Sequence, residues 1–383
     1  AVARLTGAPS ERADDAAIHE ERAPYAANGT GGGASGWVAG DPREFDRTHL
    51  LDVPALLRFL QTTEPRAVEQ LGLAEPGPKR DAFLQRLSAE IAKRGVIDVL
   101  RRGVAHHHVA SLALFYGAPT PGNLDAAAKH AANEFRVTRQ VRYSQDETAR
   151  ALDLVLFVNG LPLATFELKN QLTQQNVEDA VRQYQRDRNP NEPLFKPGRC
   201  AVHFAVDENN IRYCTELRGK DSVFLPFDRG YQDGAGNPPN PRGLRTDWLW
   251  DETLAPPSLT DIIENYAQRV VEKDANGKKR VKHLWPRYHQ LDAVRKLLAD
   301  AAAQGPGRRY LIEHSAGSGK SNTIAWLVHQ LIDLQSGDGR PAFDTVVVVT
   351  DRIILDRQLR ETIAQFTTVG ATVGAAGKSG ELR

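Results

Sequence analysis

The sequence predicts an α/β protein in two parts: a domain with a mixed sheet flanked by helices, then the start of a domain with a parallel sheet. In the first part, helical patterns give way to apolar runs of β type. The helical patterns are Val53–Leu60 and Ala82–Lys93, and the β runs are Phe135–Tyr143, Leu152–Val158, Pro162–Leu168 and Ala201–Val206. In the second part, strand, loop, helix and strand follow one another from Tyr310 to Thr350, which is typical of a parallel βαβ unit.

The composition is that of a globular protein with two domains. The chain has 383 residues, of which 41% are apolar and 25% charged. It has neither an apolar run of roughly 20 residues nor a signal-peptide core, so we expect a cytoplasmic protein without membrane spans. Its two cysteines, Cys200 and Cys214, are expected to be free buried thiols. The chain begins with Ala and contains no Met, which suggests a fragment of a longer protein.

Two segments rich in glycine mark loops, and the second marks a domain boundary. Residues 29–36 read GTGGGASG, and residues 230–243 read GYQDGAGNPPNPRG. We therefore expect a first domain at 1–230, with its core at about 130–220, and a last domain at 284–383. Between them, 231–283 is expected to form a connector with a linker helix near Leu259–Val271 and the basic segment KDANGKKRVKH. The net charge of +1 neither supports nor excludes contact with nucleic acid, which only local clusters of charge could indicate.

A phosphate-binding loop follows the strand predicted at Tyr310–Glu313. Its glycines allow backbone amides to surround phosphate oxygens, Lys320 can bridge the terminal phosphates, and Ser321 can ligate Mg²⁺. His314 departs from the general pattern, which has glycine there, and the alternative is a glycine and serine loop without nucleotide. The residues expected to bind ATP are Arg287, Gln290, His314, Ser315, Ala316, Gly317, Ser318, Gly319, Lys320 and Ser321.

The segments around this loop are similar to those of helicases. Gln290, just before a helix expected to start near Leu291, resembles the glutamine that reads the adenine edge, although it could be a surface residue. The buried strand predicted at Thr345–Thr350 ends in Asp351 and Arg352, which resembles a helicase segment that contacts DNA. No acidic Mg²⁺-holding strand follows before Arg383, so we expect this chain alone to turn over no ATP.

A second candidate site lies on the β hairpin that turns at Asn159-Gly160. Asp153 lies in an apolar strand, and Glu167 and Lys169 lie on the return strand, where residues two apart share a face and Leu168 is expected to face the core. Two carboxylates suit Mg²⁺, which can activate water, and Lys169 would orient that water or stabilise the reacting phosphorus. The alternative is a solvated strand face, which the cost of a carboxylate inside an apolar strand disfavours.

The helix predicted at Asn176–Arg188 is a candidate for DNA contact. Arg182 and Arg186 are four residues apart and share a face, and Tyr184 lies between them. A solvated helix face is the alternative.

The order of these motifs resembles one family, the restriction (R) subunit of type I restriction-modification enzymes, from about Asp41 to Arg360. The carrying segments are Asn133–Tyr143, Leu152–Gly160, Glu167–Asn170, Tyr184–Asp187, Gly234–Pro239, Pro286–Gln290 and Glu313–Ser321. Many members have a glutamine where this chain has Ala180. Glu20 is the candidate for an acid that the family's N-terminal helix contributes to the nuclease site.

This resemblance implies a fold and an activity for the complete protein. The fold would be a restriction-endonuclease-like nuclease domain followed by the start of a RecA-like helicase domain. The complete protein would use Mg²⁺ and ATP, join modification (methyltransferase) and specificity subunits, translocate double-stranded DNA and cut it. Two other classes remain open: a free-standing helicase-nuclease of DNA repair or phage defence, and a module that only docks onto partners and DNA.

Overall fold

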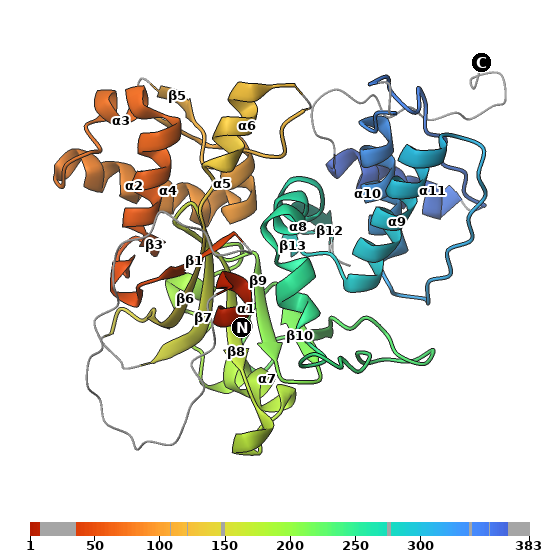
Figure 1. Cartoon of the computed structure of the whole chain (residues 1–383), viewed down its shortest axis with the longest axis horizontal. Coiled ribbons are helices and arrows are strands. Elements are labelled where there is room, and N and C mark those ends of the chain that lie inside the picture. Colours follow the sequence, from red (N-terminus) through yellow and green to blue (C-terminus); the bar gives the residue numbers. More distant parts are fainter. Residues whose placement is uncertain are drawn as a thin grey trace. The chain divides into compact units, whose positions relative to one another are not determined.

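A computed structural model describes residues 1–7, 36–107, 109–120, 122–146, 150–273, 277–336, 339–351 and 353–366. The chain divides into two units, Ala1–Glu264 and Asn265–Arg383, so the division falls within the predicted connector. Figure 1 shows the elements of both units.

A seven-stranded mixed sheet forms the centre of the first unit. Its order is β1-β6-β7-β8-β9-β10-β11, and the pairs β1/β6 and β8/β9 are parallel while the others are antiparallel. The strands are β1 Trp37–Gly40, β6 Phe135–Arg142, β7 Ala151–Val158, β8 Leu161–Leu168, β9 Val202–Val206, β10 Ile211–Cys214 and β11 Leu225–Pro226. The mixed sheet and its four predicted strands are therefore confirmed.

The β7–β8 turn has the backbone that its Asn-Gly sequence predicts. Asn159 has φ 50° and Gly160 has φ 81°, the left-handed region in which asparagine and glycine are favoured. The Asn159 side chain is buried and donates to the Leu114 carbonyl at 2.9 Å. A β carbon on Gly160 would lie 2.4 Å from the Asp52 carbonyl oxygen. The turn therefore requires glycine for space as well as for conformation.

Helices flank the sheet, and those predicted at Val53–Leu60, Ala82–Lys93 and Asn176–Arg188 are confirmed. Figure 1 shows α2 to α5 gathered above the sheet and α7 below it. The helices of this unit are α1 Val2–Thr6, α2 Val53–Thr63, α3 Pro65–Leu71, α4 Pro78–Arg94, α5 Val96–Arg102, α6 Leu124–Ala131, α7 Val177–Arg186 and α8 Pro256–Asp261. Two short ladders join β2 Phe45–Asp46 to β3 Leu51–Asp52 and β4 Val104–His106 to β5 Val109–Leu112.

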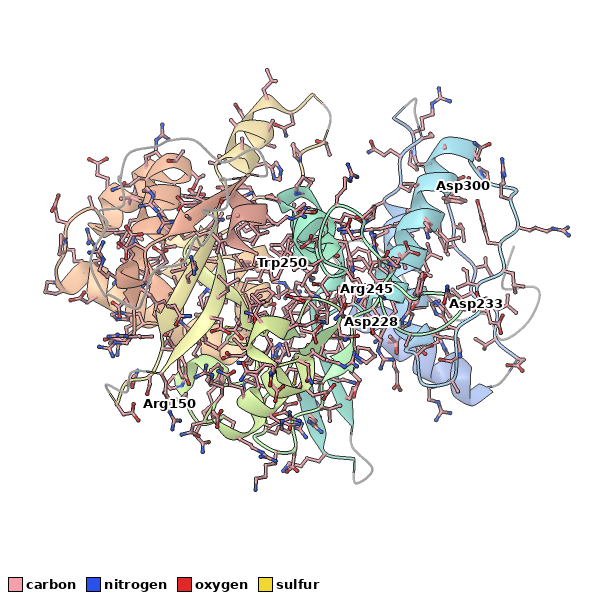
Figure 2. All side chains as sticks on the ribbon, turned by 60° about the horizontal axis from the view of Figure 1, so that its bottom comes forward. Arg150, Asp228, Asp233, Arg245, Trp250 and Asp300 are labelled. Atoms are coloured by element: carbon pink, nitrogen blue, oxygen red, sulfur yellow. The ribbon has the colours of Figure 1, made fainter. Side chains whose placement is uncertain are left out.

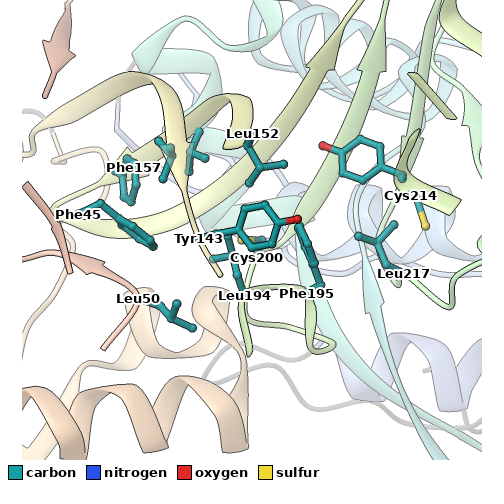
Figure 3. Packing of buried hydrophobic residues seen from close by; sticks show 13 residues of the cluster. Phe45, Leu50, Tyr143, Leu152, Phe157, Leu194, Phe195, Cys200, Cys214 and Leu217 are labelled. Atoms are coloured by element: carbon teal, nitrogen blue, oxygen red, sulfur yellow. The ribbon is translucent and has the colours of Figure 1, made fainter. Parts of the chain in front are cut away.

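A hydrophobic core lies against β6 and β7 (Figure 3). Tyr143 and Phe195 pack with ring centroids 4.7 Å apart, and the buried Cys200 and Cys214 belong to the same cluster. Both cysteines are free, as predicted. Burial raises the pKa of the Cys200 thiol to about 12, so this thiol stays protonated and unreactive at neutral pH.

The glycine-rich connector folds back onto the first unit through Asn237. Its side-chain amide donates to the Asn209 carbonyl and to Asp228, while its oxygen accepts from the Trp248 indole at 3.1 Å. Figure 2 labels Asp228, and it labels Trp250, whose ring lies 5.1 Å from that of Phe166 on β8. These contacts explain why the segment after residue 230 belongs to the first unit.

In the second unit, three helices and a two-stranded ribbon are described. They are α9 Tyr288–Gln304, α10 Lys320–Ile332, α11 Ile353–Gln365, β12 Gln268–Lys273 and β13 Lys279–Leu284. The helix expected from Leu291 begins three residues earlier. The linker helix predicted at Leu259–Val271 is wrong in its last part: a π-helical turn, Ile262–Tyr266, follows α8, and β12 comes next. All six residues of β12 pair with β13, and the β-branched Val270 and Val271 at its centre favour a strand there.

The parallel strands predicted in this unit are not formed. Within the described part of the chain, Tyr310–Glu313 and Thr345–Thr350 pair with no strand. Their apolar side chains are exposed, at 95% for Leu311 and 87% for Val349. An apolar segment becomes a stable parallel strand only when neighbouring strands take its backbone hydrogen bonds and helices cover its faces. Sequence pattern alone therefore overestimated the strand content.

Candidate functional site

The candidate carboxylates lie on adjacent central strands. Leu154 of β7 pairs with Phe166 of β8 in the antiparallel ladder. Asp153, which precedes Leu154, therefore lies next to Glu167, which follows Phe166. Asp153 accepts a hydrogen bond from the backbone amide of Leu168 at 2.8 Å. The charge of Asp153 also raises the pKa of Glu167, so the two carboxylates are close enough to interact.

Glu167 is fully buried and forms an ion pair with Arg188. The guanidinium reaches Glu167 Oε1 at 2.6 Å through Nη2 and at 2.7 Å through Nε. Burial raises the pKa of Glu167 to about 8, with Asp153 adding to the rise, while Arg188 and Lys169 oppose it. Burial alone would lower the pKa of Arg188, but the charges of Glu167 and Tyr143 and the hydrogen bonds to both residues together outweigh it, so the pKa is raised. The solvated strand face considered for Glu167 is therefore excluded.

Helix α7 explains this burial, and it corrects one prediction. Leu168, expected to face the core, is only partly buried, whereas Glu167 is enclosed. Thr165 shares a face of β8 with Glu167 and bonds to the hydroxyl of Tyr184 on α7 at 2.8 Å. Helix α7 therefore covers the face of the sheet on which Glu167 lies.

Lys169 follows β8 directly and is half-buried. Its backbone amide donates to the Val206 carbonyl at 2.9 Å. Its charge opposes the rise in the pKa of Glu167 and adds to the lowering of the pKa of Asp179, whose largest cause is the backbone hydrogen bond with Asn176. The three residues predicted as a nuclease site, Asp153, Glu167 and Lys169, are thus brought together at the end of β8.

The donor set suits a hard divalent cation in part. Glu167 Oε2 is buried and has no hydrogen-bond partner among the described residues. A buried carboxylate oxygen without a partner is costly, and a cation would satisfy it. Asp153 offers a second carboxylate next to it. No group of three or more His, Cys, Asp or Glu residues that could hold a metal occurs in the parts of the chain described, so water and substrate oxygens would have to complete such a site.

Helix α7 presents its two arginines to solvent but not its tyrosine. Arg182 and Arg186 are exposed on one face, and Arg182 pairs with Asp179. Tyr184 lies on the opposite face, fully buried, so the prediction that its side chain contacts DNA disagrees with the structure. The spacing of Val177, Ala180, Val181 and Tyr184 marks the apolar face of this helix, and that signal assigns the tyrosine to the core.

Two residues near the carboxylates were missed by the sequence analysis. Arg188 lies beyond the end of α7, where nothing in the local sequence indicates that its side chain turns inward. Its Nη2 also donates to the Ala151 carbonyl at 2.7 Å, and its guanidinium lies over the Tyr143 ring. Gln140 on β6 has a left-handed backbone, φ 51°, and donates to Asp153 Oδ1 at 3.4 Å. Nothing in the sequence around Gln140 indicates that this strand residue has a positive φ.

The phosphate loop has the backbone that its glycines predict. Gly317 has φ 73° and Gly319 has φ 87°, and Gly319 caps the N-terminus of α10. Lys320 Nζ donates to the carbonyls of His314 and Ser315 at 2.9 Å each, so the loop surrounds its own lysine. Ser315, Ala316 and Ser321 are exposed, whereas Ser318 is buried.

Gln290 packs against this loop and is buried, which excludes the surface residue considered for it. Its amide donates to the Gly319 carbonyl at 2.9 Å and its oxygen accepts from the Arg287 amide at 2.9 Å. The Arg287 side chain also approaches the loop, donating to the Gly317 carbonyl at 3.4 Å. Arg287, Gln290 and the loop are therefore brought together as predicted. The amide of Gln290 already has backbone partners, so reading an adenine would require it to exchange them.

Three predicted residues remain: Asp351, Arg352 and Glu20. Asp351 is exposed in a bend before α11. Arg352 and Glu20 lie outside the described residues.

Two family models match the chain. "Type I restriction enzyme R protein N terminus" matches residues 118–222, which include Asp153, Glu167 and Arg188, and "SWI2/SNF2 ATPase" matches residues 289–382, which include the phosphate loop. Residues 118–222 are therefore similar to the N-terminal region of type I restriction enzyme R proteins, and residues 289–382 are similar to a SWI2/SNF2 ATPase. The carboxylate hairpin falls in the first matched segment and the phosphate loop in the second.

The chain is also similar to two curated proteins. The "Type I restriction enzyme HindI endonuclease subunit" of Haemophilus influenzae is 26% identical over 245 residues, 61% of this chain and 21% of the relative. The "Putative type I restriction enzyme MjaVIIP endonuclease subunit" of Methanocaldococcus jannaschii is 26% identical over 218 residues, 55% of this chain and 19% of the relative. The chain spans about a fifth of the length of these curated relatives. None of the described helices has the length and apolarity needed to span a membrane.

Proposed function

We propose that the first unit carries a nuclease site that hydrolyses the phosphodiester bonds of double-stranded DNA. The observation that carries this proposal is the fully buried Glu167, paired with Arg188 next to Asp153 and Lys169 at the end of a central strand. A carboxylate removed from water costs several kcal/mol unless its surroundings compensate, so its presence on an apolar strand favours a function over a structural role. A restriction-endonuclease-like fold for residues 1–230 agrees with the mixed sheet.

Each side chain has a role that its environment supports. Asp153 and Glu167 would hold Mg²⁺, which when bound activates water and neutralises charge on the scissile phosphate. Arg188 holds Glu167 Oε1, which leaves Oε2 buried without a hydrogen-bond partner among the described residues. Lys169 supplies a positive charge for the attacking water or the phosphate. Arg182 and Arg186 on the exposed face of α7 are proposed to contact DNA phosphates.

The proposal extends to the complete protein, of which residues 284–383 would be the start of a RecA-like, ATP-driven motor. Lys320, Ser321 and the loop glycines would bind ATP, with Arg287 and Gln290 next to them, and Asp351 would contact DNA. In the cytoplasm, this protein would assemble with modification and specificity subunits, translocate DNA and cut it. The two relatives support this proposal, because one is named as a type I restriction enzyme endonuclease subunit and the other as a putative one.

The experiment that tests the nuclease site separates cleavage from ATP use. Asp153→Ala, Glu167→Ala and Lys169→Ala should each eliminate cleavage of supercoiled DNA by the enzyme assembled with its partner subunits, in Mg²⁺ and ATP. ATP hydrolysis should persist in all three. Because the residues act as one unit, the double variants should lose no more activity than the single ones.

Two controls make this test specific. Glu178→Ala, on the exposed surface of α7, changes a nearby acid outside the site and should leave cleavage unchanged. Glu167→Gln keeps the size of the side chain and should fold while remaining inactive. A fully active Glu167→Ala enzyme would end the nuclease assignment at this site. A wild-type enzyme that cuts without methyltransferase subunits would instead favour a free-standing helicase-nuclease.

A further inference from the structure

The basic segment that precedes α9 forms an antiparallel ribbon. Strands β12 and β13 pair from Gln268 with Leu284 to Lys273 with Lys279, without a bulge. At the base of the ribbon Val270 and Leu284 are buried, whereas β13 is exposed from Lys279 to Lys282. The backbone amide of Val271, in the middle of β12, donates to Gln365 of α11 at 2.7 Å. The ribbon is therefore held by its own unit at its base and middle, while the side chains of Lys279 to Lys282 are exposed to solvent.

The two faces of the ribbon differ in chemistry. Because side chains alternate, the pairs Val270 with Lys282 and Glu272 with Arg280 share one face with the buried base. Lys282 and Glu272 form an ion pair at 3.4 Å on that face. The other face, which we call the outer face, carries the pairs Arg269 with His283 and Val271 with Val281, and then Lys279.

The outer face combines positive charge with exposed apolar surface. Arg269 and Lys279 are exposed, and the two cross-strand valines are exposed at 37% and 39%. No acidic residue of the described ribbon lies on this face. Residues 268–284 contain six lysines and arginines against two acids, while the whole chain has a net charge of only +1. This element therefore has a local excess of positive charge that the chain as a whole does not have.

Charge of one sign on a ribbon is unfavourable for the isolated protein. Basic residues opposite or diagonal to one another across a ladder repel, and exposed valines gain nothing in water. A ribbon that served only to link two elements would have no need of either feature. A polyanion placed along the outer face removes the repulsion, and a two-stranded ribbon has a width that a major groove of duplex DNA admits.

We propose that the outer face of the β12–β13 ribbon is a contact surface for the phosphate backbone of double-stranded DNA. Arg269 and Lys279 bind phosphates on either side of the valine pair, which packs against the groove wall. This contact does not depend on base sequence, because phosphate contacts position the protein and carry no sequence information. The inference rests on the proposed action on DNA, but it concerns a different surface from the carboxylate site.

The test is a charge reversal with a matched control. The double variant Arg269→Glu/Lys279→Glu is compared with Arg66→Glu/Lys93→Glu, which makes the same change of charge at exposed positions on α3 and α4. Binding of the full 383-residue chain to a labelled 30-base-pair duplex is measured by fluorescence anisotropy in EDTA over a range of salt concentrations. Without Mg²⁺, the measurement is independent of cleavage.

We expect the ribbon variant to bind at least about tenfold more weakly than the control variant, with a salt slope lower by about 2, one for each lost phosphate contact. The neutral pair Arg269→Gln/Lys279→Gln should show the same change of slope, and circular dichroism should show native helix content in every variant. Equal affinity and slope for the ribbon and control variants would overturn the inference, as would a wild-type chain that does not bind the duplex at low salt. A complete enzyme that does not cut DNA, together with the expected weaker DNA binding of the ribbon variant, would instead overturn only the proposed function.

Discussion

At the scale of single residues, the Glu167–Arg188 pair governs the candidate site. A buried carboxylate is tolerated on an apolar strand because a guanidinium from a distant part of the chain meets it at 2.6 Å. Arg188 is in turn held by the Ala151 carbonyl and the ring of Tyr143. Removing either charge leaves the other buried without compensation, so this pair links the fold of the unit to its proposed chemistry.

We predict that Arg188→Ala lowers the free energy of unfolding by about 3 kcal/mol, since it leaves Glu167 buried and unpaired. The measurement is urea unfolding of the 383-residue chain followed by circular dichroism. Arg186→Ala, two residues earlier but exposed, should change the stability by less than about 0.5 kcal/mol. The double variant Glu167→Leu/Arg188→Met should recover most of the loss because it removes both charges. Similar behaviour of the Arg186 and Arg188 variants would contradict the ion-pair argument.

At the scale of elements, the β7–β8 hairpin positions the carboxylates. Register follows from the turn, and a shift of one residue would move Asp153 and Glu167 to the opposite faces of their strands. The turn is fixed by the left-handed backbone of Asn159 and Gly160 and by the hydrogen bond from the Asp52 amide to the Gly160 carbonyl, 2.9 Å long. That last bond also ties the turn to the start of α2.

We predict that Gly160→Ala lowers the free energy of unfolding by about 3 kcal/mol, because the new β carbon meets the Asp52 carbonyl in addition to the cost of positive φ. Gly122 is the matched control, since it has φ 86° and no atom within 4 Å of a β carbon. Gly122→Ala should therefore cost about 1 kcal/mol, from backbone conformation alone. Equal losses in the urea midpoints of the two variants would show that the close approach to Asp52 is unimportant.

At the scale of the whole molecule, the two candidate activities lie in different units. The carboxylate site lies in the first unit, and the phosphate loop lies in the second, where Lys320 donates to two loop carbonyls. The two sites have no residue in common. A substitution in one site should therefore leave the side chains of the other site unchanged.

We predict that Lys320→Ala abolishes ATP-dependent translocation in the complete enzyme while assembly with the partner subunits persists. The exposed lysine contributes a phosphate contact but no core packing. Displacement of a third DNA strand ahead of the enzyme measures translocation, and co-elution on a sizing column measures assembly. Lys296→Ala, an exposed lysine on α9, should leave both unchanged. Wild-type ATPase activity in the Lys320 variant would refute the motor assignment.

The sequence by itself determined the elements whose causes are local. The Asn159-Gly160 turn, the glycines of the phosphate loop and the apolar runs of β6 to β9 depend on backbone preferences and side-chain alternation, which neighbouring residues set. The same alternation was enough to predict that Asp153, Glu167 and Lys169 gather at one hairpin. The spacing of the apolar residues of α7 also indicates that Tyr184 is buried. The position of Tyr184 between two arginines had suggested contact with DNA instead.

Only the tertiary structure decided which side chains are enclosed and which segments become strands. Glu167 is buried because α7 returns over β8, and Arg188 meets it across 21 residues of sequence, a pairing that no local pattern encodes. Tyr310–Glu313 and Thr345–Thr350 have the composition of buried strands yet stay unpaired within the described residues, since a strand exists only with its neighbours. Local composition sets what each segment prefers, but hydrogen-bond partners and solvent exclusion come from residues far away in the chain.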